Sequence, residues 1–532
     1  MPFKKLTKSK FLKTADFKVF LTVWIVYVFY LQMFGFSHMA TNQSALTAAI
    51  VNEGRFKIDT YYRAGGEGVA YYKGHYYSGQ APGISFLSVP LYLISKPFFY
   101  LLPESTINTI FEKLEKYGEK LPEDWQGKKR ILSNYFPDLT KRQILEYVLI
   151  SGFILPVFTT ALISSLSVVC LYSILKYFSR DEKLRILITL FYGFGTLIFP
   201  LSTEFFERPI AIAFMFAAFV ILFKIRHKEL KPTKKVLFIS GALAGLSGGF
   251  DYFHIFLSAI LFFYFLAFLL LEEKNLKLTK TKFLMILSFG VGITVPIILL
   301  GLYHYTIFDN PFTISYTYMR FPEDRLTLSG LRHLSMPNSK VLFNMAVFFL
   351  YSPIIILAFY GLFRALLKKD RYFVDAAAVL AIIIATFLFS TLLVLAYYTL
   401  PSATVGSSFK RYMKPILPYT MIFLSYVFDK HKIVKKKVSV LFFVFGGISI
   451  FLNWLSAQYG GHGALGHFDL KTMKFVFIER FLKIGPSSQF LDAFAGVFHL
   501  NSLLLNLVGL AALIVLIYFI WKPYFAKIRQ LL

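Results

Sequence analysis

The sequence predicts an all-α polytopic membrane protein with about twelve transmembrane helices and a large extracytoplasmic first loop. Three observations carry this prediction. Hydrophobic residues fill 56% of the 532 positions, which is more than a soluble domain usually contains. Apolar runs of about 20 residues, the length that spans a bilayer as a helix, recur along the chain. Lysine and arginine bring the formal net charge to +28 and cluster between these runs, as in cytoplasmic membrane loops rather than on a nucleic-acid-binding face.

Each long apolar run is expected to form a helix, because backbone polar groups must be satisfied inside lipid. The runs lie at residues 17–37, 145–176, 185–202, 206–225, 234–250, 252–271, 282–303, 341–366, 374–399, 412–429, 437–455 and 502–521. No small-residue cleavage site follows the first run, so we interpret it as a retained span rather than a signal peptide. The single cysteine, Cys170, excludes an internal disulfide and a thiolate metal site.

The basic clusters orient these spans, because cytoplasmic loops carry an excess of lysine and arginine. They lie at residues 4–18, 176–185, 224–235, 274–282, 364–371, 430–437 and 522–529, and placing all of them inside makes both termini cytoplasmic. A crossing by Gly83–Leu102 would move every later cluster outside. We therefore expect an interfacial or re-entrant segment there, and Pro82, Pro90 and Pro97 favour a broken helix.

In this scheme residues 1–532 form a single transmembrane domain with two large extracytoplasmic loops. Residues 38–142 form the first loop, with interfacial helices, and residues 456–501 form a C-terminal loop. Nearly all the unusual polar residues fall in the outer loops, and ionisable groups at span ends tend to mark sites. This one-sided distribution favours an enzyme at the outer membrane face, because a transporter would place its polar groups near the middle of the membrane.

Five segments carry a resemblance to a known family. They are NQSALTAAIVNEGRFKID, YYKGHYYSGQAPGISFLSVPLY, YHYTIFDNPFTISYTY, LFNMAVFFLYSPIIILAFYGL and SSFKRYMKPILPY. In this order they resemble GT-C glycosyltransferases, which include the protein O-mannosyltransferases and the lipid A aminoarabinose transferases, and in particular a prokaryotic branch of that group. The resemblance implies inverting transfer of a sugar from a polyprenyl-phosphate carrier to an outer lipid, glycan or protein acceptor at the plasma membrane. It admits a divalent cation, Mg²⁺ or Mn²⁺, without requiring one.

Two positions depart from the family pattern. Many GT-C enzymes carry an acidic pair just after the first span, where this chain has Thr41, Asn42 and Gln43. Similar sequences often place a lysine before the Ala-Pro-Gly turn, where this chain has Gln80. The first departure leaves the identity of the base open, and the second removes a cation that could hold a phosphate. Asn42 and Gln80 remain candidates for donor binding.

Sugar transfer requires a base for the acceptor, and a positioned carboxylate can supply it. Asp59, ahead of the paired tyrosines, is the first candidate; the alternative is that it caps a turn. Asp251 lies between two predicted spans, and it is either a second catalytic candidate or a helix cap.

The leaving phosphate requires positive charge or hydrogen-bond donors. Arg411 is the main candidate because a guanidinium can hold two oxygens, with Lys410 beside it; the alternative for Arg411 is a snorkelling interfacial side chain. Glu207 and Arg208 are either donor-binding residues or a local ion pair. His75 is placed at a hairpin tip whose turn is Lys73-Gly74, and it is either a donor-binding residue or structural. Tyr76 and Tyr77 either form a wall for the sugar or the lipid head or are interface anchors, since tyrosine suits a membrane interface. Tyr252 is a further candidate for donor binding. No metal-ligand spacing is present.

Two other functions fit the same sequence. A carrier or flippase of lipid-linked saccharides would use the same outer groove without chemistry. A non-catalytic membrane scaffold would explain the missing acidic pair.

Overall fold

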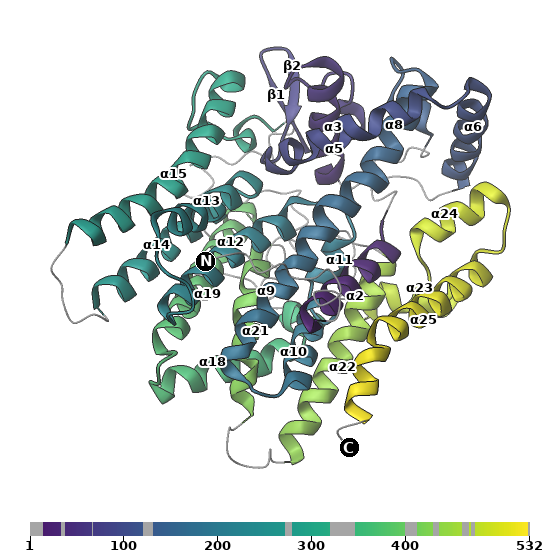
Figure 1. The fold of residues 1–532 in the computed structure, drawn as a ribbon. Coiled ribbons are helices and arrows are strands. Elements are labelled where there is room, and N and C mark those ends of the chain that lie inside the picture. The colour runs from purple at the N-terminus through teal and green to yellow at the C-terminus, as the bar shows by residue number, and fades with distance from the viewer. Residues whose placement is uncertain are drawn as a thin grey trace.

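The computed structural model describes residues 14–32, 38–65, 68–120, 131–271, 279–319, 346–398, 412–428, 436–459, 468–469 and 474–529. Helices dominate this part of the chain, as the sequence predicts, and its strands form two antiparallel pairs (Figure 1). The elements up to residue 226 are α2 (Ala15–Phe29), α3 (His38–Glu53), α4 (Tyr62–Gly65), β1 (Val69–Tyr72), β2 (His75–Ser78), α5 (Gly83–Tyr100), α6 (Glu104–Lys120), α7 (Leu132–Tyr135), α8 (Lys141–Leu149), the π-helical turns η2 (Ile150–Ile154) and η3 (Val157–Ala161), α9 (Leu162–Phe178), α10 (Glu182–Phe194), α11 (Ile198–Ser202) and α12 (Glu207–Arg226).

The remaining elements continue the helical pattern. They are α13 (Lys234–Phe250), α14 (His254–Leu271), α15 (Lys280–Phe308), η4 (Ser315–Tyr318), α18 (Ile354–Lys368), α19 (Phe373–Tyr398), η7 (Lys414–Ile416), α21 (Leu417–Ile422), η8 (Phe423–Val427), α22 (Lys436–Tyr459), β3 (Phe468–Asp469), β4 (Lys474–Phe475), α23 (Val476–Ile484), α24 (Gln489–Phe498) and α25 (Ser502–Arg529).

Fewer helices than predicted are long and apolar enough to cross a membrane. Among the described residues there are 6, or up to 7 if the bent pair α5–α6 crosses as one span, so about twelve spans are not confirmed. The 6 are Lys141–Phe178, Glu207–Arg226, Lys280–Phe308, Phe373–Thr391, Ser439–Tyr459 and Ser502–Tyr524. Several other predicted runs are helical but short or interrupted. The run at 412–429, for example, divides into η7, α21 and η8 near two prolines.

The segment Gly83–Leu102 differs in detail from its prediction. The helix α5 runs unbroken through Pro90 and Pro97, both of which are exposed. The break comes after α5, where its axis meets that of α6 at 113°. A bend of this size fits either a broken span or a re-entrant loop.

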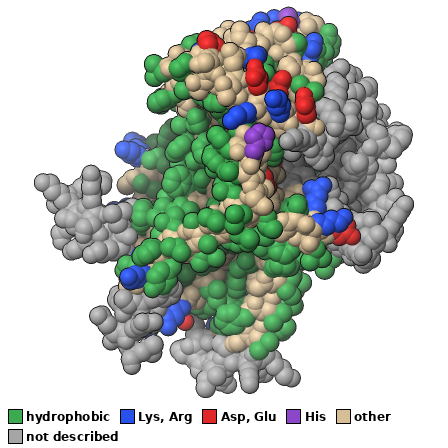
Figure 2. Space-filling view, turned by 90° about the vertical axis from the view of Figure 1, so that its right-hand side faces the viewer, with side chains coloured by type: hydrophobic (Ala, Val, Ile, Leu, Met, Phe, Trp, Pro, Cys, Tyr) green, Lys and Arg blue, Asp and Glu red, His purple; other side chains and the backbone are tan. Residues whose placement is uncertain are grey.

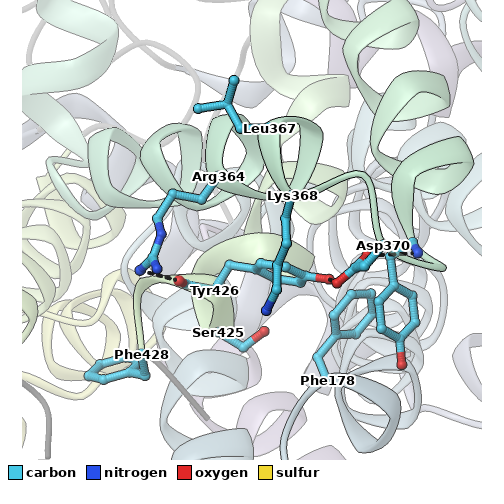
Figure 3. A pocket seen from close by; sticks show the side chains of 9 residues that line it. Phe178, Arg364, Leu367, Lys368, Asp370, Ser425, Tyr426 and Phe428 are labelled. Atoms are coloured by element: carbon cyan, nitrogen blue, oxygen red, sulfur yellow. Dashed lines mark hydrogen bonds between the residues drawn. The ribbon is translucent and has the colours of Figure 1, made fainter. Parts of the chain in front are cut away.

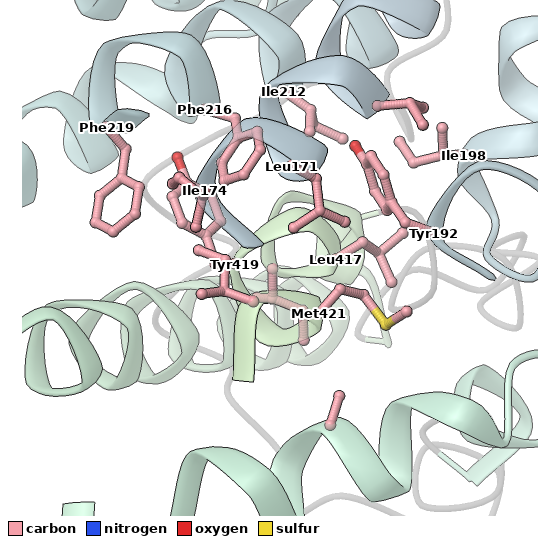
Figure 4. Close-up of a cluster of buried hydrophobic side chains, with 14 of the residues drawn as sticks. Leu171, Ile174, Tyr192, Ile198, Ile212, Phe216, Phe219, Leu417, Tyr419 and Met421 are labelled. Carbon is pink, nitrogen blue, oxygen red and sulfur yellow. The ribbon is translucent and has the colours of Figure 1, made fainter. Parts of the chain in front are cut away.

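Two hydrophobic cores organise the chain. The larger core joins α2, α9, α10, α12, α14, α19 and α21, and Figure 4 shows Phe216 and Phe219 of α12 against Tyr419 of α21. The second core joins the predicted first loop, from α3 to α8, to the start of α12 and the end of α15. On the face shown in Figure 2, hydrophobic side chains cover most of the middle, and many of the charged side chains gather at the upper end.

Helices α13 and α15 approach unusually closely through glycines. A Cβ atom at Gly241 or Gly245 of α13 would collide with the carbonyl oxygens of Phe289 or Ile293 of α15, and one at Gly292 would collide with α13. Small residues at such spacing let helix backbones touch in membranes. This contact fixes the end of α13, which carries Asp251 as its C-cap.

Candidate functional site

A β-hairpin forms the outer part of the site. Strands β1 and β2 pair antiparallel, with Tyr72 opposite His75. The turn residues Lys73 and Gly74 have φ of 47° and 84°, which is the left-handed backbone of a two-residue type I′ turn. The predicted turn at Lys73-Gly74 is therefore confirmed, and it places His75 directly after the tip.

Asp59 holds this hairpin by both carboxylate oxygens. Its Oδ1 accepts a hydrogen bond of 2.7 Å from the backbone N–H of Tyr76, and its Oδ2 lies 2.9 Å from Nδ1 of His75. The Asp59 side chain is 31% exposed. When Nδ1 carries the ring hydrogen, the other ring nitrogen of His75 is left as an acceptor. Among the described residues no hydrogen bond engages that second nitrogen.

The paired tyrosines make different contacts. The ring of Tyr76 stacks on Tyr62 with centroids 3.9 Å apart, whereas Tyr77 is buried against Phe308. The hydroxyl of Tyr72 donates to Asp309 Oδ2 at 3.1 Å. These contacts attach the hairpin to the end of α15, so several tyrosines support the hairpin itself.

A second group, the Arg208 cluster, lies beneath the predicted first loop and consists of Gln43, Glu207, Arg208 and Asp251. Arg208 Nε donates to Asp251 Oδ2 at 3.2 Å and lies 3.8 Å from Glu207 Oε1. Gln43 Nε2 donates to Glu207 Oε2 at 2.7 Å. All four side chains are buried. Such charges are expensive to bury unless they are paired or serve a site.

Local structure explains how these residues meet. Glu207 and Arg208 open α12, and a carboxylate in the first turn of a helix is favoured by the helix dipole. Asp251 ends α13, and its Oδ1 accepts from the N–H of Phe253 at 3.3 Å, so it is both a turn cap and an ion-pair partner. Because α12 and α13 pack together, the start of one lies beside the end of the other.

Aromatic rings and further polar groups surround Arg208. Its guanidinium carbon lies 4.8 Å from the ring centroid of Tyr412 and 5.5 Å from that of Phe206, a geometry that favours a cation. The ammonium of Lys414, also fully buried, lies 5.8 Å from the Phe206 ring. The imidazole of His254 is buried in the turn that follows Asp251.

Several polar atoms here have no hydrogen-bond partner among the described residues. They are Nη1 of Arg208, both ring nitrogens of His254 and Oε1 of Gln43. A buried polar atom without a partner is uncommon in a folded protein and calls for a water, an ion or a ligand. Arg208 Nη1 and one ring nitrogen of a neutral His254 can donate to a ligand, whereas Gln43 Oε1 can only accept.

A third set of contacts lies between the hairpin and the Arg208 cluster. The hydroxyl of Tyr316 donates to Gln80 Oε1 at 3.2 Å, and the rings of Tyr316 and Tyr252 meet edge-on with centroids 5.6 Å apart. The Tyr252 hydroxyl lies 3.0 Å from Nε2 of His304. Asn42 instead donates to the carbonyl of Gly65 at 3.2 Å.

The structure thus divides the predicted site residues into separate groups. Asp59, His75 and Tyr76 form one, and Glu207, Arg208 and Asp251 form another; the hydrogen bonds and ion pairs of the described chain do not link Asp59 to Asp251. The predicted phosphate ligands at positions 410 and 411 lie outside the described residues.

The sequence analysis did not predict that Gln43 donates a hydrogen bond to the carboxylate of Glu207. It also did not single out His254, His304, Tyr316 and Lys414. A histidine inside an otherwise apolar run was the available signal for His254 and His304, because polar groups in such runs are costly. No group of three or more histidine, cysteine, aspartate or glutamate side chains within the described part of the chain could hold a metal ion.

No protein-family model matches the chain, and no curated protein matches it. Among solved structures, the chain is similar to the Archaeoglobus fulgidus oligosaccharyltransferase in its apo form, with a TM-score of 0.45 and 12% sequence identity. The alignment covers 85% of this chain and 56% of that one, so the chain spans little more than half of its length. A likeness at this level does not establish a family.

Proposed function

We propose that this chain is a membrane glycosyltransferase that moves a sugar from a polyprenyl-phosphate donor to a lipid, glycan or protein acceptor outside the cytoplasm. The observation that carries the proposal is the Arg208 cluster, where a buried guanidinium and a buried imidazole retain donors without partners. The resemblance of five sequence segments to GT-C glycosyltransferases supplies the reaction class, and the apolar helices agree with a lipid-linked substrate.

Arg208 is assigned to the phosphate of the donor. Its Nε is held by Asp251 and its guanidinium lies near the rings of Tyr412 and Phe206, which leaves Nη1 for a phosphate oxygen. A preorganised donor stabilises the negative charge that gathers on the leaving phosphate. Lys410 and Arg411, which directly precede Tyr412 in the sequence, are proposed to contribute further positive charge.

Asp59 and His75 are assigned to the acceptor. Because both oxygens of Asp59 are already engaged, Asp59 orients His75, whose second ring nitrogen receives the proton. In this step the acceptor O–H bond breaks, the proton passes to His75, and the oxygen attacks the anomeric carbon. The bond from that carbon to the phosphate oxygen breaks, and the phosphate leaves with the electron pair. Asp251 is the alternative base, because it contacts the proposed phosphate ligand.

The test separates binding from turnover. Membranes containing the protein are supplied with a polyprenyl-phosphate-linked hexose, and release of polyprenyl phosphate and retention of the intact donor are both measured. Asp59→Asn and His75→Gln are expected to lower release by about 10²- to 10⁴-fold, the usual share of general base catalysis, with donor binding unchanged. Chelation in a parallel sample measures any contribution from Mg²⁺ or Mn²⁺.

Arg208→Lys provides the complementary arm, because it keeps the charge but loses the second donor nitrogen. It is expected to weaken donor binding by about tenfold, the value of one hydrogen bond to a charged group. The matched control for Asp59→Asn and His75→Gln is Lys73→Asn, because Lys73 lies in the same hairpin and asparagine suits its left-handed turn. Full release by both Asp59→Asn and Asp251→Asn would refute the assigned base, whereas absence of release by the wild-type protein would refute the enzyme. Movement of intact donor across the bilayer without release would indicate a flippase.

A further inference from the structure

A cavity of about 360 Å³ lies at the opposite end of the helices from the hairpin, away from every residue of the candidate site. It opens between the last turn of α18, the end of α9 and the end of η8 (Figure 3). Its lining residues are Phe178, Arg364, Leu367, Lys368, Asp370, Tyr372, Ser425, Tyr426 and Phe428.

Two cations one helical turn apart dominate the charge of this cavity. Arg364 Nη1 donates to the carbonyl of Tyr426 at 3.1 Å, which fixes the guanidinium at the wall. Lys368 is exposed, its ammonium lies 6.0 Å from the Tyr426 ring centroid, and it makes no ion pair with another described residue. Lys368 is therefore available to an incoming anion.

The one carboxylate in the lining is already engaged. Asp370 Oδ1 accepts from the N–H of Tyr372 at 2.9 Å, and its Oδ2 accepts from the hydroxyl of Tyr426 at 2.8 Å. Asp370 therefore holds the two tyrosines in place rather than pairing with Lys368. Two cations and one carboxylate leave a surplus of one positive charge in the cavity.

An apolar stripe leads away from the cavity along α18. It consists of Ile356, Tyr360, Phe363 and Leu367, all of them exposed large hydrophobic residues. Their spacing of three and four positions puts them on one face of the helix. Leu367 belongs both to this stripe and to the cavity lining, so the charged cavity and the apolar face are continuous.

We propose that this cavity binds the phosphate of an anionic membrane lipid, with Arg364 and Lys368 on the phosphate and an acyl chain along the stripe of α18. Basic pockets between membrane helices are suited to phosphate headgroups. The basic clusters at 176–185 and 364–371 surround this end of the helices, and the charge rule puts them in the cytoplasm, so the lipid belongs to the inner leaflet. The inference is independent of the proposed glycosyl transfer.

The experiment uses the full-length protein purified in a neutral detergent. Binding of phosphatidylglycerol is compared with that of phosphatidylcholine carrying the same acyl chains, by native mass spectrometry. Wild type should prefer phosphatidylglycerol. Lys368→Ala should weaken phosphatidylglycerol binding by about fivefold, the effect of one basic residue near an anionic lipid. The matched control, Lys183→Ala, removes an equally exposed lysine near the same end, outside the cavity, and should leave binding unchanged.

Asp370→Asn supplies a change of opposite sign, because it removes negative charge from the cavity while keeping the side-chain shape. It should tighten phosphatidylglycerol binding. Equal binding by wild type, Lys368→Ala and Asp370→Asn would overturn the proposal. A third sample contains inorganic phosphate at the same concentration in place of lipid. Binding of phosphate that is weakened by Lys368→Ala to the same extent would overturn the lipid assignment in favour of a free anion.

Discussion

The two ends of α12 each carry a buried arginine paired with an aspartate, yet the two pairs differ in how completely they are satisfied. At the last turn, Asp375 Oδ1 accepts from the Tyr264 hydroxyl at 2.5 Å, and its Oδ2 contacts Arg226 and lies 2.9 Å from Nε2 of His227. Arg226 also donates to the carbonyl of Arg371 at 2.9 Å. We call Arg226, His227, Tyr264 and Asp375 the Asp375 cluster.

At the first turn, the Arg208 cluster is less complete. Arg208 binds Asp251 by Nε, but its Nη1 and the nearby His254 ring have no partners among the described residues. A fully hydrogen-bonded buried network makes a structure rigid, whereas a partly satisfied one is costly without a ligand. The comparison teaches that burial and ion pairing alone do not single out a candidate site, and that the unsatisfied donors distinguish the Arg208 cluster from the Asp375 cluster.

The largest loss of stability should come from the Asp375 cluster, where the buried ion pair is more completely hydrogen-bonded. Asp375→Ala removes the acceptor that Arg226, His227 and Tyr264 share, and breaking a buried pair in this way costs about 3–5 kcal/mol. Asp251→Ala should cost about 1–3 kcal/mol, because Glu207 and two aromatic rings still face Arg208. Thermal unfolding of the purified variants measures the difference.

Measuring donor binding tests the same difference between the Arg208 cluster and the Asp375 cluster. Asp251→Ala releases the guanidinium of Arg208 and should weaken retention of the proposed polyprenyl-phosphate donor. A conservative change at the other end, Asp375→Asn, should leave retention unchanged in the fraction that folds. Equal losses of stability at the two ends, or equal losses of donor binding, would contradict the division into a structural cluster and a site.

A smaller effect is expected from moving Asp251 without removing it. Gly245→Ala places a Cβ against the backbone of Ile293, whereas the same change at Gly249, one turn later in α13, meets no atom within 4 Å. Overpacking of this kind costs about 1–3 kcal/mol, while Gly249→Ala should be neutral or stabilising through helix propensity. Unfolding temperatures of the two variants test the expectation, and equal temperatures would show that the close approach of α13 and α15 is not limiting.

Local features of the structure could be predicted from the sequence. The hairpin turn at Lys73-Gly74 is set by two adjacent residues, and the all-α class follows from the long apolar runs. The approach of Arg208 to Asp251 was also accessible in principle. Both residues were singled out individually, and two helices joined by a short connection put the start of the first beside the end of the second.

Long-range and sub-helical features were not accessible. Gln43 meets Glu207 across 164 residues of sequence, and no local pattern specifies that contact. Hydropathy also counts apolar runs without showing where they break. The run at 185–202 divides at Gly195, which ends α10, and α11 is too short to span a membrane. Breaks of this kind account for two of the predicted spans, those at 185–202 and 412–429.

The smallest effect on stability is expected at the exposed ion pair between Lys73 and Asp309, in contrast to the two buried ion pairs of α12. Asp309 Oδ2 accepts a 2.7 Å hydrogen bond from Lys73 Nζ, and this bond lowers the pKa of Asp309 below its usual value. A carboxyl group with a lowered folded-state pKa stabilises the fold above its unfolded pKa, and that stabilisation is lost as the pH falls through the folded pKa.

The hairpin should therefore be unaffected near neutral pH and loosen only in acid, below about pH 4, where an ordinary aspartate becomes protonated. Hydrogen exchange of the β1 and β2 amides, corrected for the intrinsic pH dependence of exchange, measures this. Lys73→Asn keeps the turn but removes the charge partner, so its hairpin should lose most of the acid dependence. Because both members of the pair are two-thirds exposed, solvent and salt screen their attraction, and 0.5 M salt should reduce the difference between wild type and Lys73→Asn. Persistence of the full difference in salt would assign the effect to the buried tyrosine contacts instead.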